Sequence, residues 1–157
     1  MTIGGIPLLY FGDEVGTLND YSYRSDPSKE HDSRWVHRPQ MDWKKVDLRN
    51  DPATIEGRVY QGLKSLIKLR QSEPVFSGHE TEIIDCNNPH IFGFLRNHLG
   101  ERMLVLANFN ETMQKIPANL LRLYGLGYQF VDLLSGKETG IQDLELRPFQ
   151  LVCLKAG

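Results

Sequence analysis

The second half of the chain is a series of short apolar segments separated by turn sequences, and this pattern constrains the fold most strongly. After Pro74, turn-forming stretches such as NNP, NHLGE, NFNE and SGKETG recur at short intervals. The segments between them have the length and residue types of β-strands. We expect strands near residues 80–85, 90–96, 102–108, 113–116, 129–134, 144–146 and 149–155. Short strands at this spacing predict an antiparallel β-sandwich.

The first half follows a different pattern, which begins with the apolar run GIPLLYF at residues 5–11. The run is continuously apolar rather than alternating, which is typical of a strand that is covered on both faces in a parallel sheet. Residues 12–50 then show neither a helical nor a strand period, although their aromatic residues argue against disorder. A helix is predicted over residues 52–71, with Asp51 as its N-cap and Pro52 at its first position.

Composition limits the classes of ligand and partner. The 157 residues are 40% hydrophobic and carry a formal net charge of -2, so a packed core is expected, with no basic face for nucleic acid or anionic lipid. A polar, uncharged ligand fits this balance better. Cys86 and Cys153 are expected to be small buried residues rather than a disulfide. The apolar opening is too short to span a bilayer and lacks the features of a signal peptide, so we expect no membrane association and favour a cytoplasmic location.

The sequence indicates neither a metal ion nor a cofactor. His31 and His37 lie on either side of Asp32, but a six-residue spacing in a loop matches no tetrahedral ligand pattern. The stretch SGKETG lacks the spacing and the following helix that a phosphate-binding loop requires, so it is expected to be a hairpin turn.

The order of GIPLLYFGDE, DSRWVHRP, LIKLRQSEP and a closing β domain that ends in LRPFQLVCLK resembles the end of the α-amylase superfamily. Within this superfamily of retaining glycoside hydrolases and transglucosylases, HDSRWVHRP and RNDP look most like the amylosucrase branch, which transfers glucose from sucrose to an α-glucan. The resemblance implies a mainly β fold class. It implies that residues 74–157 are the C-terminal antiparallel β-sandwich domain, and that residues 1–73 are the C-terminal remnant of a (β/α)₈ catalytic barrel. In that remnant, residues 5–11 are the last strand, 12–50 a long loop and 52–71 the last helix.

The same resemblance implies that the catalytic carboxylates are absent from this chain, because the family carries them on earlier parts of the barrel. Retaining transfer needs two carboxyl groups that face each other at roughly 5 Å. Asp13 and Glu14 are adjacent, and neighbouring residues of an extended segment point to opposite faces. We therefore expect no catalytic residue here and no activity of the chain alone. The alternatives are a β-sandwich module that binds carbohydrate or protein, and a structural domain without a ligand.

The resemblance also assigns the long loop to the sugar pocket, because loops after the barrel strands form the active sites of such folds. Arg34 corresponds to an arginine that pairs with an aspartate from an early barrel loop, and Arg38 is the alternative for this role. The guanidinium group suits the role because its planar donors bind a carboxylate bidentately. With that aspartate absent, Arg34 is expected to be exposed without a carboxylate partner. Asp13 and Glu14 are candidates for binding sugar hydroxyls, although ordering of the neighbouring turns is the favoured role.

Aromatic residues of the loop complete the candidate substrate-binding set. Tyr21 and Trp35, and with weaker claims Tyr23 and Trp43, carry rings that suit the apolar faces of pyranoses, although packing of the loop is the favoured role for all four. The partners expected in the full-length enzyme are sucrose or an α-glucan. The strand at residues 5–11 is expected to associate with the rest of the barrel, with the β domain or with a second copy of the chain, because its apolar side chains are each worth about 1.5–3 kcal/mol when buried.

Overall fold

The structure, a computed structural model, describes residues 1–157, and their contacts divide them into two compact units. Residues 8–65 form one unit, here called the loop unit, and residues 1–7 with 66–157 form the other, here called the β unit. The predicted division between residues 73 and 74 rests on the resemblance to a barrel and its β domain, and it stays a prediction. None of the helices combines the length and apolarity that crossing a bilayer requires.

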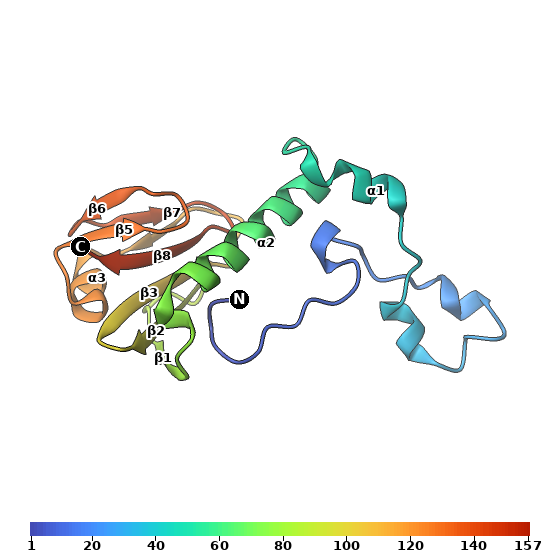
Figure 1. Cartoon of the computed structure of the whole chain (residues 1–157), viewed down its shortest axis with the longest axis horizontal. Coiled ribbons are helices and arrows are strands. Elements are labelled where there is room, and N and C mark those ends of the chain that lie inside the picture. The colour runs from blue at the N-terminus through green and yellow to red at the C-terminus, as the bar shows by residue number, and fades with distance from the viewer. The chain divides into compact units, whose positions relative to one another are not determined.

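The β unit is built on one large antiparallel sheet (Figure 1). In spatial order, the six strands of this sheet are β1 (Glu80–Ile84), β2 (Ile91–His98), β3 (Glu101–Asn108), β8 (Leu151–Ala156), β5 (Gln129–Asp132) and β6 (Glu138–Gly140). A second sheet pairs β4 (Gln114–Ile116) with β7 (Leu144–Leu146). Every strand pair is antiparallel. The predicted mainly β, antiparallel fold is therefore confirmed, and each of the seven expected strands has a counterpart.

Besides the short turn η5 (Pro74–Phe76), two elements of the β unit were not predicted. The stretch SGKETG is only partly a turn, because its second half is strand β6, which pairs with β5. The helix α3 (Ala118–Gly125) follows Pro117 and buries Leu120 and Leu121 in the core. Its apolar spacing is helical, but eight residues are too few for this period to stand out in the sequence.

The central strands are buried on both faces. One face packs residues such as Leu104, Leu106 and Leu154 against α3 and the small sheet. The opposite face packs Val105 and Cys153 against the end of the preceding helix, because successive side chains of a strand point to opposite sides. The two cysteines are free and buried, as expected. Burial raises the pKa of the Cys86 thiol to about 11 and that of Cys153 to about 12.

The predicted helix forms as α2 (Ile55–Ser72), but it begins three residues later than expected. Asp51 does not cap it. The Asp51 carboxylate accepts a hydrogen bond from the backbone of Ala53 (2.9 Å), which makes a separate turn, and the hydroxyl of Thr54 accepts from the backbone of Gly57 (3.0 Å). Thr54 therefore provides the oxygen that satisfies a free N–H group of the first helical turn.

Residues 5–11 do not form the expected strand. Ile6 is 97% exposed and Leu8 is 84% exposed, and the segment has no strand partner in the chain. A strand gains its stability from hydrogen bonds to neighbouring strands, and the large sheet of the β unit uses none of these residues. This part of the prediction is therefore wrong for the chain by itself.

The loop unit consists of short helical turns rather than irregular backbone. These turns are η1 (Asp13–Val15), η2 (Ser22–Ser25), η3 (Ser33–His37), α1 (Trp43–Asp47) and η4 (Leu48–Asn50), followed by α2. The backbone N–H of Asp20 donates to the carbonyl of Val36 (2.9 Å), which joins the stretch before η2 to η3. The loop is thus ordered by a series of local turns.

Candidate functional site

The six predicted substrate-binding residues lie on three neighbouring turns of the loop unit. Asp13 and Glu14 begin η1, Tyr21 immediately precedes η2, and Arg34, Trp35 and Arg38 lie in or directly after η3. The side chains on η1 point back to their own turn. The Asp13 carboxylate accepts a hydrogen bond from the backbone of Tyr10, and the Glu14 carboxylate accepts one from Gly12, both at 2.9 Å. These contacts are those of residues that order a turn.

Arg34 has a carboxylate partner within the chain, contrary to expectation. Its guanidinium donates two hydrogen bonds to Asp32, from Nε to Oδ1 and from Nη2 to Oδ2, both at 2.8 Å. The Arg34 side chain remains 74% exposed. Hydrogen bonds from Arg34 lower the pKa of the Asp32 carboxyl to about 2. Sequence reasoning missed Asp32 as the partner, although its position two residues before Arg34 and just ahead of η3 brings the two groups together.

Trp35 and Arg38 come together in a hollow of the loop unit with a volume of about 580 Å³. We call this the loop hollow. It is lined by Thr17, Leu18, Asn19, Asp20, Ser22, Tyr23, Lys29, Trp35, Arg38, Pro39, Gln40, Asp42 and Lys45. The other four predicted residues, Asp13, Glu14, Tyr21 and Arg34, do not line it. The structure adds Lys29 and Lys45, which no sequence motif singled out.

Cations lie over the aromatic rings of the site. The Lys29 ammonium is 5.2 Å from the centre of the Trp35 ring, and the Arg38 guanidinium carbon is 5.9 Å from it. The guanidinium of Arg24 lies at 5.2 Å from the ring of Tyr21. At these distances a cation is attracted to the π face of the ring. A sugar that stacked on the same part of Trp35 would have to displace those cations.

Three acidic side chains of the loop unit, Asp20, Asp26 and Asp32, do not have the properties of a general acid. Asp20 and Asp26 accept hydrogen bonds from Ser22 and Ser28 respectively, and these bonds lower the pKa of each carboxyl, in Asp26 to about 2. The Asp32 pKa is lowered in the same way by Arg34. A carboxyl that donates a proton to a leaving group needs a raised pKa instead. These residues therefore order the loop.

The two histidines considered for metal binding have separate partners. His31 lies 3.4 Å from a carboxylate oxygen of Glu30, and Nδ1 of His37 lies 3.1 Å from the amide oxygen of Asn19. The chain contains no group of three or more His, Cys, Asp or Glu side chains arranged to hold a metal ion.

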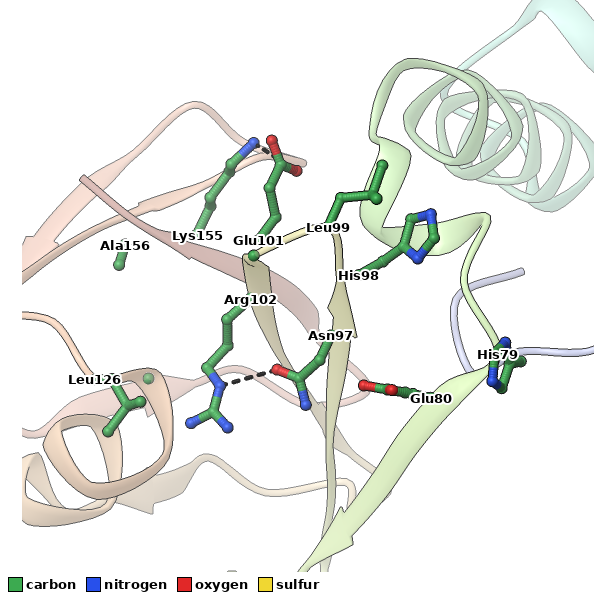
Figure 2. Close-up of a pocket in the computed structure, with 12 residues that line it drawn as sticks. His79, Glu80, Asn97, His98, Leu99, Glu101, Arg102, Leu126, Lys155 and Ala156 are labelled. Carbon is green, nitrogen blue, oxygen red and sulfur yellow. Dashed lines mark hydrogen bonds and ion pairs between the residues drawn. The ribbon is translucent and has the colours of Figure 1, made fainter.

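A second hollow, of about 730 Å³, lies in the β unit around the turn between β2 and β3 (Figure 2). Four of its polar side chains form two pairs. Nε of Arg102 donates to Asn97 (2.9 Å), and Lys155 lies 3.3 Å from a carboxylate oxygen of Glu101. The same lysine also binds Glu73 at 2.9 Å. None of the predicted site residues lies here.

No family model matches the chain. Among curated proteins, glucosylglycerate phosphorylase of Escherichia coli (strain K12) is 27% identical over 157 residues, which is 99% of this chain and 26% of that protein. Oligo-1,6-glucosidase of Bacillus cereus is 30% identical over 103 residues, which is 62% of this chain and 17% of that protein. The chain thus spans about a quarter or less of the length of these relatives.

Solved structures give the same fold. Ttha1563 from Thermus thermophilus matches 99% of this chain and 29% of its own length, with a TM-score of 0.67 and 23% identity. AmyP in complex with maltotriose matches 65% of this chain and 21% of its own, with a TM-score of 0.57 and 19% identity. The relatives and neighbours include α-amylase-family enzymes, which supports the superfamily that the motifs resemble without distinguishing the amylosucrase branch.

Proposed function

We propose that this chain is the C-terminal part of a retaining α-glucoside-active enzyme of the α-amylase superfamily, in which the loop unit forms one wall of the sugar site and the β unit stabilises the barrel. One observation carries the proposal. The match to the phosphorylase relative covers 99% of this chain but only 26% of the phosphorylase. A chain that corresponds throughout to a fraction of an enzyme is expected to act together with the remainder.

The chain's own residues serve to position the site. The turn at η1 is held by Asp13 and Glu14, and the ion pair of Arg34 with Asp32 fixes the start of η3. The lowered pKa values of Asp20, Asp26 and Asp32 keep these carboxyls ionised at neutral pH. We expect the nucleophile and the proton donor to come from the remainder of the enzyme, and the chain alone to be inactive.

The donor that we propose first is sucrose, with an α-glucan as acceptor, because HDSRWVHRP and RNDP resemble the amylosucrase branch. The names of the sequence relatives suggest two further α-glucosides to be compared with it, glucosylglycerate and an α-1,6-linked oligosaccharide. All three donors share an α-glucosyl group, which is the part that the common site would bind.

The test replaces the matching C-terminal segment of the Escherichia coli phosphorylase with this chain. We expect the fusion to release the leaving group of at least one of the three donors, and the isolated chain to release none. As a control, the phosphorylase is cut and rejoined at the same point with its own segment. Donor turnover by the isolated chain would contradict the proposal. A fusion that is folded but inactive would also contradict the proposal, provided that the rejoined control is active.

A further inference from the structure

We propose that the loop hollow binds a phosphate group, either as inorganic phosphate or as part of a sugar phosphate. Three cationic side chains line this hollow, those of Lys29, Arg38 and Lys45. The two carboxylates that also line it are Asp20 and Asp42. The inference goes beyond the proposed function, because that function rests on the α-glucosyl group that the three donors share and makes no use of these cations.

Local bonds occupy the two carboxylates but leave two of the cations free. Asp42 accepts hydrogen bonds from the backbone N–H groups that follow it, as the N-cap of α1, and Asp20 accepts from the backbone of Ser22 (2.8 Å). Lys29 is paired with Asp26 at 2.9 Å. By contrast, Arg38 and Lys45 form neither an ion pair nor a side-chain hydrogen bond within the chain. Two unpaired cations on one hollow favour an anionic ligand.

The Trp35 ring supports this arrangement. Lys29 and Arg38 both lie over its ring, at 5.2 Å and 5.9 Å, so the ring attracts two of the three cations that line the hollow. A guanidinium group binds phosphate oxygens through two parallel hydrogen bonds, and an ammonium group adds a point charge. Lys29 is already paired with Asp26, so Arg38 beside the ring and the unpaired Lys45 provide the donors that phosphate recognition requires.

The size of the hollow indicates what else it accepts. A volume of about 580 Å³ is within the range of small-molecule sites and exceeds the space that a single phosphate ion fills. Neutral polar side chains of Asn19, Tyr23 and Gln40 line the remainder. Groups of this kind can bind hydroxyls, so a hexose phosphate fits the lining as well as free phosphate does.

Isothermal titration of the full chain tests the proposal, with inorganic phosphate, glucose 1-phosphate and glucose added at constant ionic strength. We expect saturable binding of at least one phosphate compound and weaker binding of glucose. Tighter binding of glucose 1-phosphate than of inorganic phosphate would identify a sugar phosphate as the ligand, and equal affinity would identify free phosphate. R38Q and K45Q should each weaken binding about tenfold or more, because each removes a charge-assisted contact.

K44Q is the matched control, since Lys44 neighbours Lys45 on α1 but does not line the loop hollow. It should bind as the original chain does. Circular dichroism of each variant checks the fold, and K45Q serves as the test if R38Q does not fold. The proposal is overturned if neither phosphate compound binds saturably, if K44Q weakens binding as much as K45Q, or if glucose binds as tightly as glucose 1-phosphate. Because binding is measured directly, none of these outcomes bears on the activity of the fusion enzyme.

Discussion

Arg96 on β2 is a fully buried cation that holds the start of the chain on the β unit. Its side chain is 0% exposed. The guanidinium donates to the carbonyl of Ile3 (2.8 Å), to the hydroxyl of Thr81 (2.5 Å) and to the carbonyl of Gly78. Arg70 donates in the same way to the carbonyls of Met1 and Gly5. The two arginines thus satisfy backbone groups that have no place in the large sheet.

Replacement of Arg96 by methionine is therefore expected to destabilise the chain. The methionine fills a similar volume but leaves the part-buried carbonyls of Ile3 and Gly78 without their donor, and an unsatisfied group costs about 1–3 kcal/mol when it is buried. We expect the free energy of unfolding to fall by about 2 kcal/mol or more, measured by urea denaturation. R147M is the control, since Arg147 is exposed and its loss should change stability by about 0.5 kcal/mol or less. Equal urea midpoints for the two variants would contradict this role.

The pairing of Arg34 shows why individual contacts are harder to predict than the location of a site. The motif DSRWVHRP drew attention to η3, and Trp35 and Arg38 do line a hollow there. The prediction that Arg34 lacks a carboxylate partner was wrong, because an aspartate two residues away reaches the guanidinium without any long-range contact. The cations of the loop hollow were missed for a different reason. A net charge of -2 describes the whole chain and does not reveal a local group of cations.

At the scale of elements, the start of α2 depends on a tight turn that no sequence period indicates. The hydroxyl of Thr54 donates to the carbonyl of Asp51 (2.8 Å) and accepts from the backbone of Gly57. This turn brings the Asp51 carbonyl directly against Gly57, where a Cβ atom would overlap it. At Gly62, further along the same helix, no atom lies within 4 Å of the position of a Cβ. Helix α2 thus has room for a Cβ atom at Gly62 but not at Gly57.

Alanine substitutions at these glycines are expected to change stability in opposite directions. G62A should raise the free energy of unfolding by about 0.5–1 kcal/mol, because alanine favours a helix interior over glycine. G57A gains the same helix propensity but must move the Asp51 carbonyl, so it should lower stability. Thermal denaturation followed by circular dichroism at the helical band compares the two variants. Stabilisation by G57A as large as that by G62A would show that the turn at Asp51 is not tight.

Elements that are marked by a signal in their own sequence were predictable, and elements that depend on neighbouring segments of the fold were not. The predicted strands of the β unit are short, largely apolar segments between turn signals, so their positions could be predicted to within two residues. Helix α3 has only eight residues, too few for its period to stand out, and strand β6 contains no apolar side chain that would mark it as a strand. Residues 5–11 have the composition of a strand but no partner strand in this chain. Composition indicates what a segment can form, and the neighbours decide whether it forms.

At the scale of the whole molecule, the unpaired segment at residues 6–11 is the feature that most affects behaviour in solution. Every residue of this segment is exposed, and all of its side chains are apolar or aromatic. An extended segment with free backbone groups and apolar side chains is a template for pairing with another strand. The rest of a barrel would cover it on both faces. When the chain is alone, we expect a second copy to provide the partner strand.

Self-association should therefore depend on concentration and on the apolar character of this segment. Size-exclusion chromatography with light scattering is expected to show dimers or larger species that dissociate on dilution. L8K should shift the population to monomer, because a lysine next to the pairing strand is costly to bury. L18K is the matched control, since Leu18 is also largely exposed, at 79%, but lies outside the segment. A chain that stays monomeric at all concentrations, or an equal effect of L8K and L18K, would show that residues 6–11 do not mediate association.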